Sequence, residues 1–145
     1  MKFKTILVPI DFSENSLNAF QAAIDKYSDC DCRLILLHVI EPMPSDTAFG
    51  TGLDSDQVNT RQHQLRTLGN SHKEGWLEVE TRVEFGRPAD VILITATHEK
   101  VDLVIIGANA KSKGFGLWLG SNAYAMARAL PCSVLIVKPE RQPEG

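Results

Sequence analysis

Long hydrophobic runs and a surplus of positive charge are both missing from this chain of 145 residues. No apolar run approaches the roughly 20 residues that a membrane-spanning helix requires. Residues 1–13 lack the small-residue cleavage site of a signal peptide, so we expect a cytoplasmic protein that binds no membrane. The net charge of -3 argues against nucleic acid as a partner, because nucleic-acid-binding surfaces cluster positive charge. A small anionic ligand is compatible with this charge.

Cysteine is also scarce, with three residues in the chain. Cys30 and Cys32 are separated by one residue and Cys132 lies far away, which matches neither a disulfide framework nor the CxxC spacing of zinc and redox sites. We therefore expect reduced thiols. No Ser-His-Asp set, Cys-His set, carboxylate pair or metal-ligand spacing stands out either, so the sequence does not indicate catalysis or a metal site.

Hydrophobic residues make up 43% of the chain and charged residues 23%, an ordinary composition for one globular domain. We expect this domain to span residues 1–138, with residues 139–145 as a disordered tail. Four short segments are nearly continuous runs of Ile, Val and Leu, as in parallel strands that are buried on both faces. They are residues 6–10, 34–40, 103–106 and 134–137.

A fifth segment, residues 77–85, alternates apolar with charged residues. This pattern predicts an edge strand with one face in water. Its apolar side carries Leu77, Val79, Val83 and Phe85.

Helix signals lie between these strands. Ser13 can cap a helix whose apolar stripe is Leu17, Phe20, Ile24 and Tyr27.

A polar helix is expected over residues 54–72, with Gly69 as a candidate early end. Pro88 suits the first turn of a helix over residues 88–98. A last helix over residues 121–130 is stopped by Pro131.

Strict alternation of strands and helices predicts an α/β fold, a doubly wound parallel five-stranded sheet with helices on both faces. With residues 77–85 at one edge, the simplest strand order is 3-2-1-4-5. Ligands in such sheets bind at the carboxyl ends of the strands that flank the reversal. Here those ends carry Pro9 and Asp11 on the first strand, and Ile106 and Gly107 on the fourth.

The loop after Gly107 is a candidate phosphate site. Gly120 and Ser121 open the next helix, whose free N–H groups and partial positive charge favour an anion. The alternative is that its glycines only mark turns, since neither GxxxxGK[ST] nor GxGxxG is present. Position at the sheet reversal makes the two interpretations about even.

The spacing of Gly107, Ala110, Gly120 and Ser121 resembles the G-x-x-G, nine residues, G-[ST] signature of the universal stress protein family. Segments along nearly the whole chain look like parts of the same family. They are residues 6–13, 37–39, 86–89 and 129–137. The resemblance implies a Rossmann-like or flavodoxin-like domain, usually a homodimer, in a family of which one branch binds ATP.

The resemblance also implies the residues of a nucleotide site. Asp11 is expected at the ribose or adenine and the Val39 backbone at the adenine edge, with ATP or AMP as the ligand and Mg²⁺ only together with the nucleotide. The full set of candidate residues is Pro9, Asp11, Val39, Ile106, Gly107, Ala110, Gly120, Ser121 and Asn122. At Ala110 the family has glycine, and a methyl group obstructs a close phosphate or a positive φ.

Three functions remain open at this point. One is a dimeric regulatory module of the stress response that binds adenine nucleotide, and another is a dimeric interaction protein that has lost the nucleotide. The third, an adenylating enzyme or pyrophosphatase, is weakly supported. Such enzymes on a related fold carry a serine-glycine-glycine loop after the first strand, which is absent here, and no residue offers itself as a base. At most, slow ATP hydrolysis is expected.

A homodimer is expected through the last strand, whose apolar edge invites pairing with another chain. This strand carries Val134, Leu135, Ile136 and Val137. His38, within an aliphatic strand, is expected to be a hydrogen-bonded core residue.

Overall fold

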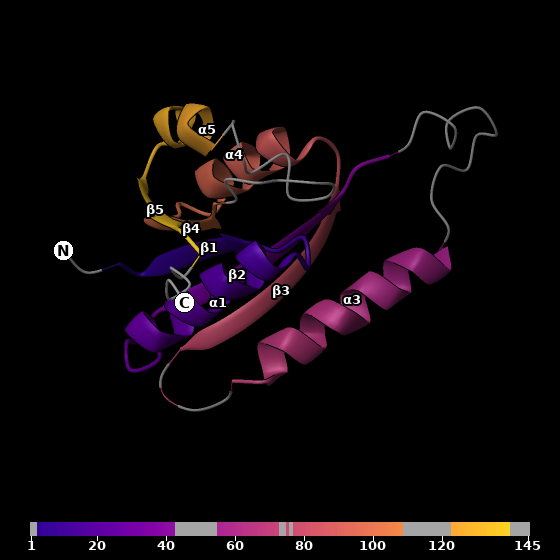
Figure 1. Cartoon of the computed structure of the whole chain (residues 1–145), viewed down its shortest axis with the longest axis horizontal. Helices are drawn as coiled ribbons and strands as arrows, with labels where there is room; N and C mark the ends of the chain where they lie inside the picture. The colour runs from indigo at the N-terminus through magenta and orange to yellow at the C-terminus, as the bar shows by residue number, and fades with distance from the viewer. Residues whose placement is uncertain (1–2, 43–54, 73–74, 76, 109–122, 140–145) are drawn as a thin grey trace, which may run out of the picture.

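The computed structural model describes residues 3–42, 55–72, 75, 77–108 and 123–139 (Figure 1). Within these ranges, five strands alternate with four helices. The strands are β1 (Thr5–Pro9), β2 (Arg33–Ile40), β3 (Glu78–Phe85), β4 (Leu103–Gly107) and β5 (Ser133–Val137). The helices are α1 (Glu14–Tyr27), α3 (Ser55–Asn70), α4 (Pro88–His98) and α5 (Ala123–Ala129).

The strands form one parallel sheet in the order β3-β2-β1-β4-β5. This order confirms the prediction. Leu7 in the middle of β1 lies beside Ile35 of β2 and Val104 of β4. The chain therefore leaves β1 in one direction and returns to its other side with β4, which produces the reversal at which such sheets bind ligands.

Helices cover both faces of the sheet (Figure 1), and an apolar layer lies between the sheet and the helices on each face. On one face, α1 and α3 pack through residues such as Phe20, Ile24 and Leu65. On the other, α4 and α5 pack through Ile92 and Met126, among others. Because the central strands contribute side chains to both layers, they are apolar at nearly every position.

Helix α1 begins where the sequence predicts. The Ser13 side chain accepts a hydrogen bond from the Ser16 N–H at 3.3 Å, as an N-cap does. The predicted apolar stripe is wrong at Leu17, which is 38% exposed. The buried stripe instead includes the small residues Ala19 and Ala23, which let the helix lie close to the sheet.

Gly69 does not end α3, contrary to the prediction. It lies inside the helix and is buried, and a Cβ built on it would lie 3.2 Å from methyl groups of Val79 and Thr81. Glycine at this position lets α3 approach β3 closely. The helix itself ends at Asn70.

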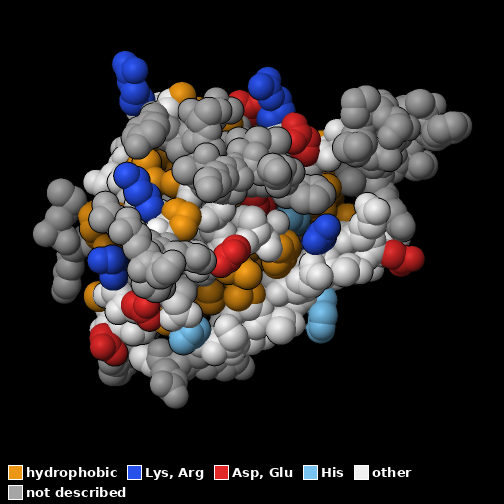
Figure 2. Space-filling model, viewed as in Figure 1, with side chains coloured by type: hydrophobic (Ala, Val, Ile, Leu, Met, Phe, Trp, Pro, Cys, Tyr) orange, Lys and Arg blue, Asp and Glu red, His pale blue; other side chains and the backbone are white. Residues whose placement is uncertain are grey.

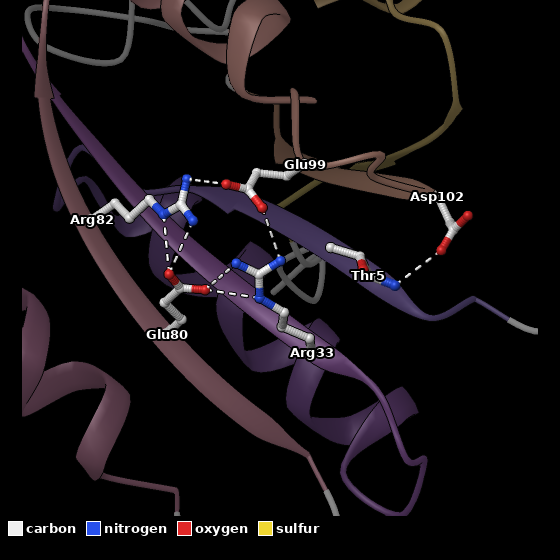
Figure 3. Close-up of polar contacts among 6 residues, drawn as sticks. All are labelled: Thr5, Arg33, Glu80, Arg82, Glu99 and Asp102. Atoms are coloured by element: carbon white, nitrogen blue, oxygen red, sulfur yellow. Dashed lines mark hydrogen bonds and ion pairs between the residues drawn. The ribbon is translucent and has the colours of Figure 1, made fainter. Parts of the chain in front are cut away.

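The polar face of β3 is not simply in water. Glu80 and Arg82 of β3 form a four-membered ion-pair network with Arg33 of β2 and Glu99, which follows α4 (Figure 3). The four side chains are 24% to 36% exposed. The alternating pattern therefore predicted the edge position correctly but not the partners.

All three cysteines are free thiols, as expected. Burial is the largest factor that raises the pKa of both Cys32 and Cys132. Both groups therefore favour the protonated, unreactive form.

Candidate functional site

The candidate site lies where β1 and β4 end side by side. Pro9, Ile106 and Gly107 are buried at these ends, and the Ile10 N–H donates to the Leu37 carbonyl oxygen at 2.7 Å. This bond holds the exit of β1 against β2. The chain then turns into α1 within three residues, so Asp11 lies directly at the sheet reversal.

Asp11 has one satisfied and one unsatisfied carboxylate oxygen. Its Oδ1 accepts from the Ser13 N–H at 2.9 Å and from the Ser13 hydroxyl, while its own N–H donates to Ser16 Oγ at 3.3 Å. Its Oδ2 is buried and has no hydrogen-bond partner among the described residues. A buried acceptor without a donor is costly, and a bound hydroxyl or amine would relieve that cost.

Gly107 is required by packing rather than by backbone conformation. A Cβ at this position would lie 2.0 Å from the Asn15 carbonyl oxygen and 3.1 Å from the Ser16 nitrogen. Only glycine therefore allows β4 to end against the first turn of α1. From the sequence, Gly107 was predicted to lie near bound phosphates. The motif gave no indication of its contact with α1.

His38 is a hydrogen-bonded core residue, as predicted. It is 7% exposed, and its Nδ1 lies 2.7 Å from the Ile10 carbonyl oxygen. Since a carbonyl only accepts, Nδ1 carries the proton. Burial lowers the pKa of His38 below its usual value, against the opposing effect of the bond to Ile10. The neutral ring thus ties the exit of β1 to β2.

Phe12 and Arg61 are additional residues at this site that the sequence did not indicate. Phe12 has a positive φ of 64°, and its ring centroid lies 4.9 Å from that of His38. The guanidinium of Arg61 in α3 lies 5.7 Å from the Phe12 ring centroid, a cation–π distance. The position of Phe12 between Asp11 and the Ser13 cap could have drawn attention to it. Its contacts could not be predicted, because His38 and Arg61 belong to elements far along the chain.

Phe12 also lines an apolar groove of about 510 Å³ between α1 and α3. Leu17 and Leu68 contribute to the same groove. Figure 2 shows hydrophobic side chains gathered in the region between these helices. The groove adjoins the candidate site through Phe12.

The structure brings five of the nine predicted site residues to one end of the sheet. Pro9, Asp11, Ile106 and Gly107 surround the reversal, and Val39, 7% exposed, lies at the same end of β2. The other four lie outside the described residues. They are Ala110, Gly120, Ser121 and Asn122.

Two further features bear on ligands and location. In the described ranges, no three His, Cys, Asp or Glu side chains gather as a metal site would require. No helix within those ranges has the length and apolar character to cross a bilayer.

Comparison with known proteins identifies relatives along the whole chain. The model of the universal stress protein family matches residues 2–138. A putative universal stress protein of Staphylococcus aureus is 29% identical over 147 residues, an alignment that covers 97% of this chain and 87% of the relative.

Solved structures show the same fold. Hypothetical protein MJ0577 superposes with a TM-score of 0.79 at 23% identity, covering 98% of this chain and all of that one. A universal stress protein in complex with cAMP has a TM-score of 0.64 at 23% identity (94% and 98% covered). A universal stress protein family protein from Arabidopsis thaliana with AMP bound has a TM-score of 0.66 at 19% identity (98% and 96% covered). With its sheet order and its family match over residues 2–138, this chain belongs to the universal stress protein family.

Proposed function

We propose that the protein is a regulatory module of the stress response that binds an adenine nucleotide at the end of β1 and β4. The observation that carries this proposal is the buried Oδ2 of Asp11, which has no hydrogen-bond partner among the described residues. An acceptor at the sheet reversal suits a ribose hydroxyl, because a hydroxyl donates a hydrogen bond without adding charge.

The relatives support the adenosine part of this ligand. One is a complex with cAMP and another has AMP bound. In this chain, Asp11 would hold the ribose, and the backbone at Val39 would lie at the adenine edge. Phosphates would extend past Gly107 toward Ala110, Gly120, Ser121 and Asn122. ATP, with Mg²⁺ only as its counterion, is the proposed physiological form.

Asp11→Asn tests this assignment. The asparagine keeps an oxygen for the Ser13 N–H but replaces the acceptor at Oδ2 by an amide donor. We expect the affinity for AMP and ATP, measured by isothermal titration calorimetry, to fall about tenfold, the loss of one buried hydrogen bond.

The matched control is Asp25→Asn on the exposed side of α1, where the carboxylate only accepts from Gln21. This variant should bind as the wild type does. Circular dichroism of each variant separates lost binding from lost folding. Absence of saturable heat for the wild type with millimolar AMP and ATP would refute the proposal.

A second candidate function is that of an interaction protein without nucleotide, and the alanine at position 110 favours it. Its methyl group would obstruct a close phosphate. If the site binds nucleotide and tolerates the methyl group of Ala110, the Ala110→Gly variant should bind ATP with an affinity within a few-fold of that of the wild type. A site that binds ATP only after this substitution would favour the second candidate.

A homodimer through β5 completes the proposal. β5 is the edge opposite β3, and the N–H of Ser133 donates to the Asp102 carbonyl on the β4 side. The direction of the backbone N–H and C=O groups alternates along a strand, so Val134 and Ile136 direct these groups to the open side, away from β4. All four apolar residues of β5 are half-buried, and no strand of the described ranges pairs with its outer side. This edge therefore offers both backbone groups and apolar surface to a second copy.

A further inference from the structure

We propose that the open edge of β3, together with the groove between β3 and α4, binds an extended segment of a partner protein that carries an apolar and a basic residue two positions apart. The segment would join the sheet as a sixth strand. This surface lies at the sheet edge opposite β5. Glu84 is the sheet neighbour of Val39, so the groove borders the candidate nucleotide site, but none of the residues that line it belongs to that site. The proposal therefore does not depend on nucleotide binding.

The backbone of β3 is available on one side. β2 pairs with it along its whole length, and no strand of the described ranges pairs with its other side. The N–H groups of Glu78 and Gly86, at its two ends, donate to carbonyl oxygens on the β2 side. Since these directions alternate, Val79, Thr81 and Val83 point their N–H and C=O groups to the open side. An extended peptide can bond to this row.

An apolar groove accompanies this edge. It has a volume of about 390 Å³ and lies between the second half of β3 and α4. Ile94 is 56% exposed and Phe85 44%, and both line it together with Val91. Of the three large hydrophobic residues that are exposed in the described part of the chain, two are therefore here. One apolar side chain of an added strand would find a place on this surface.

The charges on this surface select a basic segment. Arg82 and Glu99, which also line the groove, neutralise each other at 2.6 Å. Glu84 on the groove and Glu78 at the other end of β3 are exposed and form no ion pair with a described residue. Apart from His98, which also lines the groove, the charge that lacks an ion-pair partner among the described residues of this surface is thus negative. A lysine or arginine two positions from the apolar anchor would lie on the same face of the added strand, within reach of Glu84.

The same charges disfavour a second copy of this chain at β3. In an antiparallel pairing centred on Thr81, Glu78 of one copy would face Glu84 of the other, and the reverse. Glu80 would face Arg82, but both of these already have ion-pair partners within their own chain. A parallel in-register pairing would place each glutamate beside itself. Like charges directly opposite are destabilising, so β3 is protected against self-pairing while it remains open to a basic strand.

A synthetic peptide of about eight residues, close to the usual strand length, provides the probe. Valine and lysine take turns at every second position, with threonine between them, so that both lie on the same face. Binding to the full chain is measured by fluorescence anisotropy at low ionic strength, and its place by the amide NMR shifts of Val79, Thr81 and Val83. We expect saturable binding with shifts centred on these amides. The peptide with glutamate in place of lysine should not bind. Proline at two adjacent central positions should abolish binding, because one of the two N–H groups faces β3 and proline lacks it.

Two exposed substitutions test the surface without disturbing the core. Ile94→Ser should weaken peptide binding about threefold or more by removing apolar contact. Glu84→Lys should weaken binding of the lysine peptide by a similar factor and should permit the glutamate peptide to bind. Leu17→Ser, an exposed leucine on α1, is the matched control and should change nothing.

Four results would overturn the proposal. The first is saturable binding with amide shifts away from β3, and the second is equal affinity of the lysine and glutamate peptides. The third is self-association of the wild type through β3, visible without peptide as amide shifts of Val79, Thr81 and Val83 that depend on protein concentration. The fourth is no detectable binding of the lysine peptide at millimolar concentration.

Discussion

At the scale of single residues, Gly107 connects the fold to the site. The end of β4 comes so close to α1 that a Cβ at this position would lie 2.0 Å from the Asn15 carbonyl oxygen. Backbone on both sides leaves little room for adjustment. The position at which β4 meets α1, and with it the shape of the sheet reversal, therefore depends on this glycine.

Gly107→Ala should accordingly lower the free energy of unfolding by about 1–3 kcal/mol, the usual cost of forcing extra volume into a packed site. Urea unfolding followed by circular dichroism measures the change. Gly69→Ala is the comparison, because its Cβ would meet only side-chain methyl groups at 3.2 Å, which can shift. We expect a change below about 1 kcal/mol there, and equal effects at both glycines would contradict this account.

His38 makes the stability depend on pH. Its pKa is lower in the folded protein than the ordinary 6.5, with burial as the main cause. The unfolded chain therefore binds more protons below pH 6.5, and the free energy of unfolding falls as the pH drops through this value, by at most about 1.4 kcal/mol per pH unit. His38→Leu should remove this slope between pH 6.5 and the lower folded pKa.

The control for this prediction is His63→Gln, which replaces an exposed histidine of α3. Thermal or urea unfolding at several pH values gives the slope for each variant. An unchanged slope in His38→Leu, or a slope lost in His63→Gln, would show that another group is responsible.

At the scale of elements, the ion-pair network joins β2, β3 and the end of α4 on one face of the sheet. Burial raises the pKa of Glu80, but hydrogen bonds from Arg33 and Arg82 outweigh it, so that the pKa is lowered. Hydrogen bonds from the same two arginines lower the pKa of Glu99. The stabilisation is therefore present above the ordinary carboxyl value of 4.5 and is lost as the pH falls below it.

A double-mutant cycle with Arg82→Ala and Glu99→Ala measures this coupling. At neutral pH and low salt we expect about 0.5–1 kcal/mol in the free energy of unfolding, since the partly exposed groups are screened. The coupling should shrink in high salt and also as the pH falls below 4.5. The exposed pair Arg87 and Asp90, at 3.9 Å, is the control and should show almost none. Equal coupling in both pairs would argue against a network.

The elements themselves follow closely from the hydrophobic pattern. The predicted helix over residues 88–98 agrees with α4, and each strand agrees within one residue at either end. The misjudged residues, Leu17 and Gly69, are ones whose environment depends on another element. Gly69 resembles a helix end in isolation, and only the approach of α3 to β3 explains it.

At the scale of the whole molecule, the two edges of the sheet have different characters. β5 is short and apolar, whereas β3 carries three glutamates and one arginine. We propose the first as the dimer edge and the second as the edge for a basic partner. This asymmetry would prevent open-ended stacking. A dimer formed through β5 has a β3 strand at each outer edge, and the like charges of β3 disfavour pairing with a further copy.

Ile136→Pro tests the dimer. Ile136 directs its N–H to the open side, so proline removes a bond to the second copy and none to β4. We expect light scattering to give twice the chain mass for the wild type and one chain mass for the variant, with an unchanged circular dichroism spectrum. Leu135→Pro, which removes an N–H on the β4 side, should instead lower stability. A monomeric wild type at micromolar concentration would contradict the prediction.

Local pattern was sufficient to determine the strand order, the alternation of elements, the reversal and the position of Asp11, because burial on both faces demands apolar runs and parallel strands require crossover helices. The tertiary structure alone decided that Asp11 Oδ2 is buried without a described partner and that Gly107 touches α1. It also decided that Arg33 meets Glu99. Each of these depends on distances between segments far apart in the chain, which no local sequence pattern encodes.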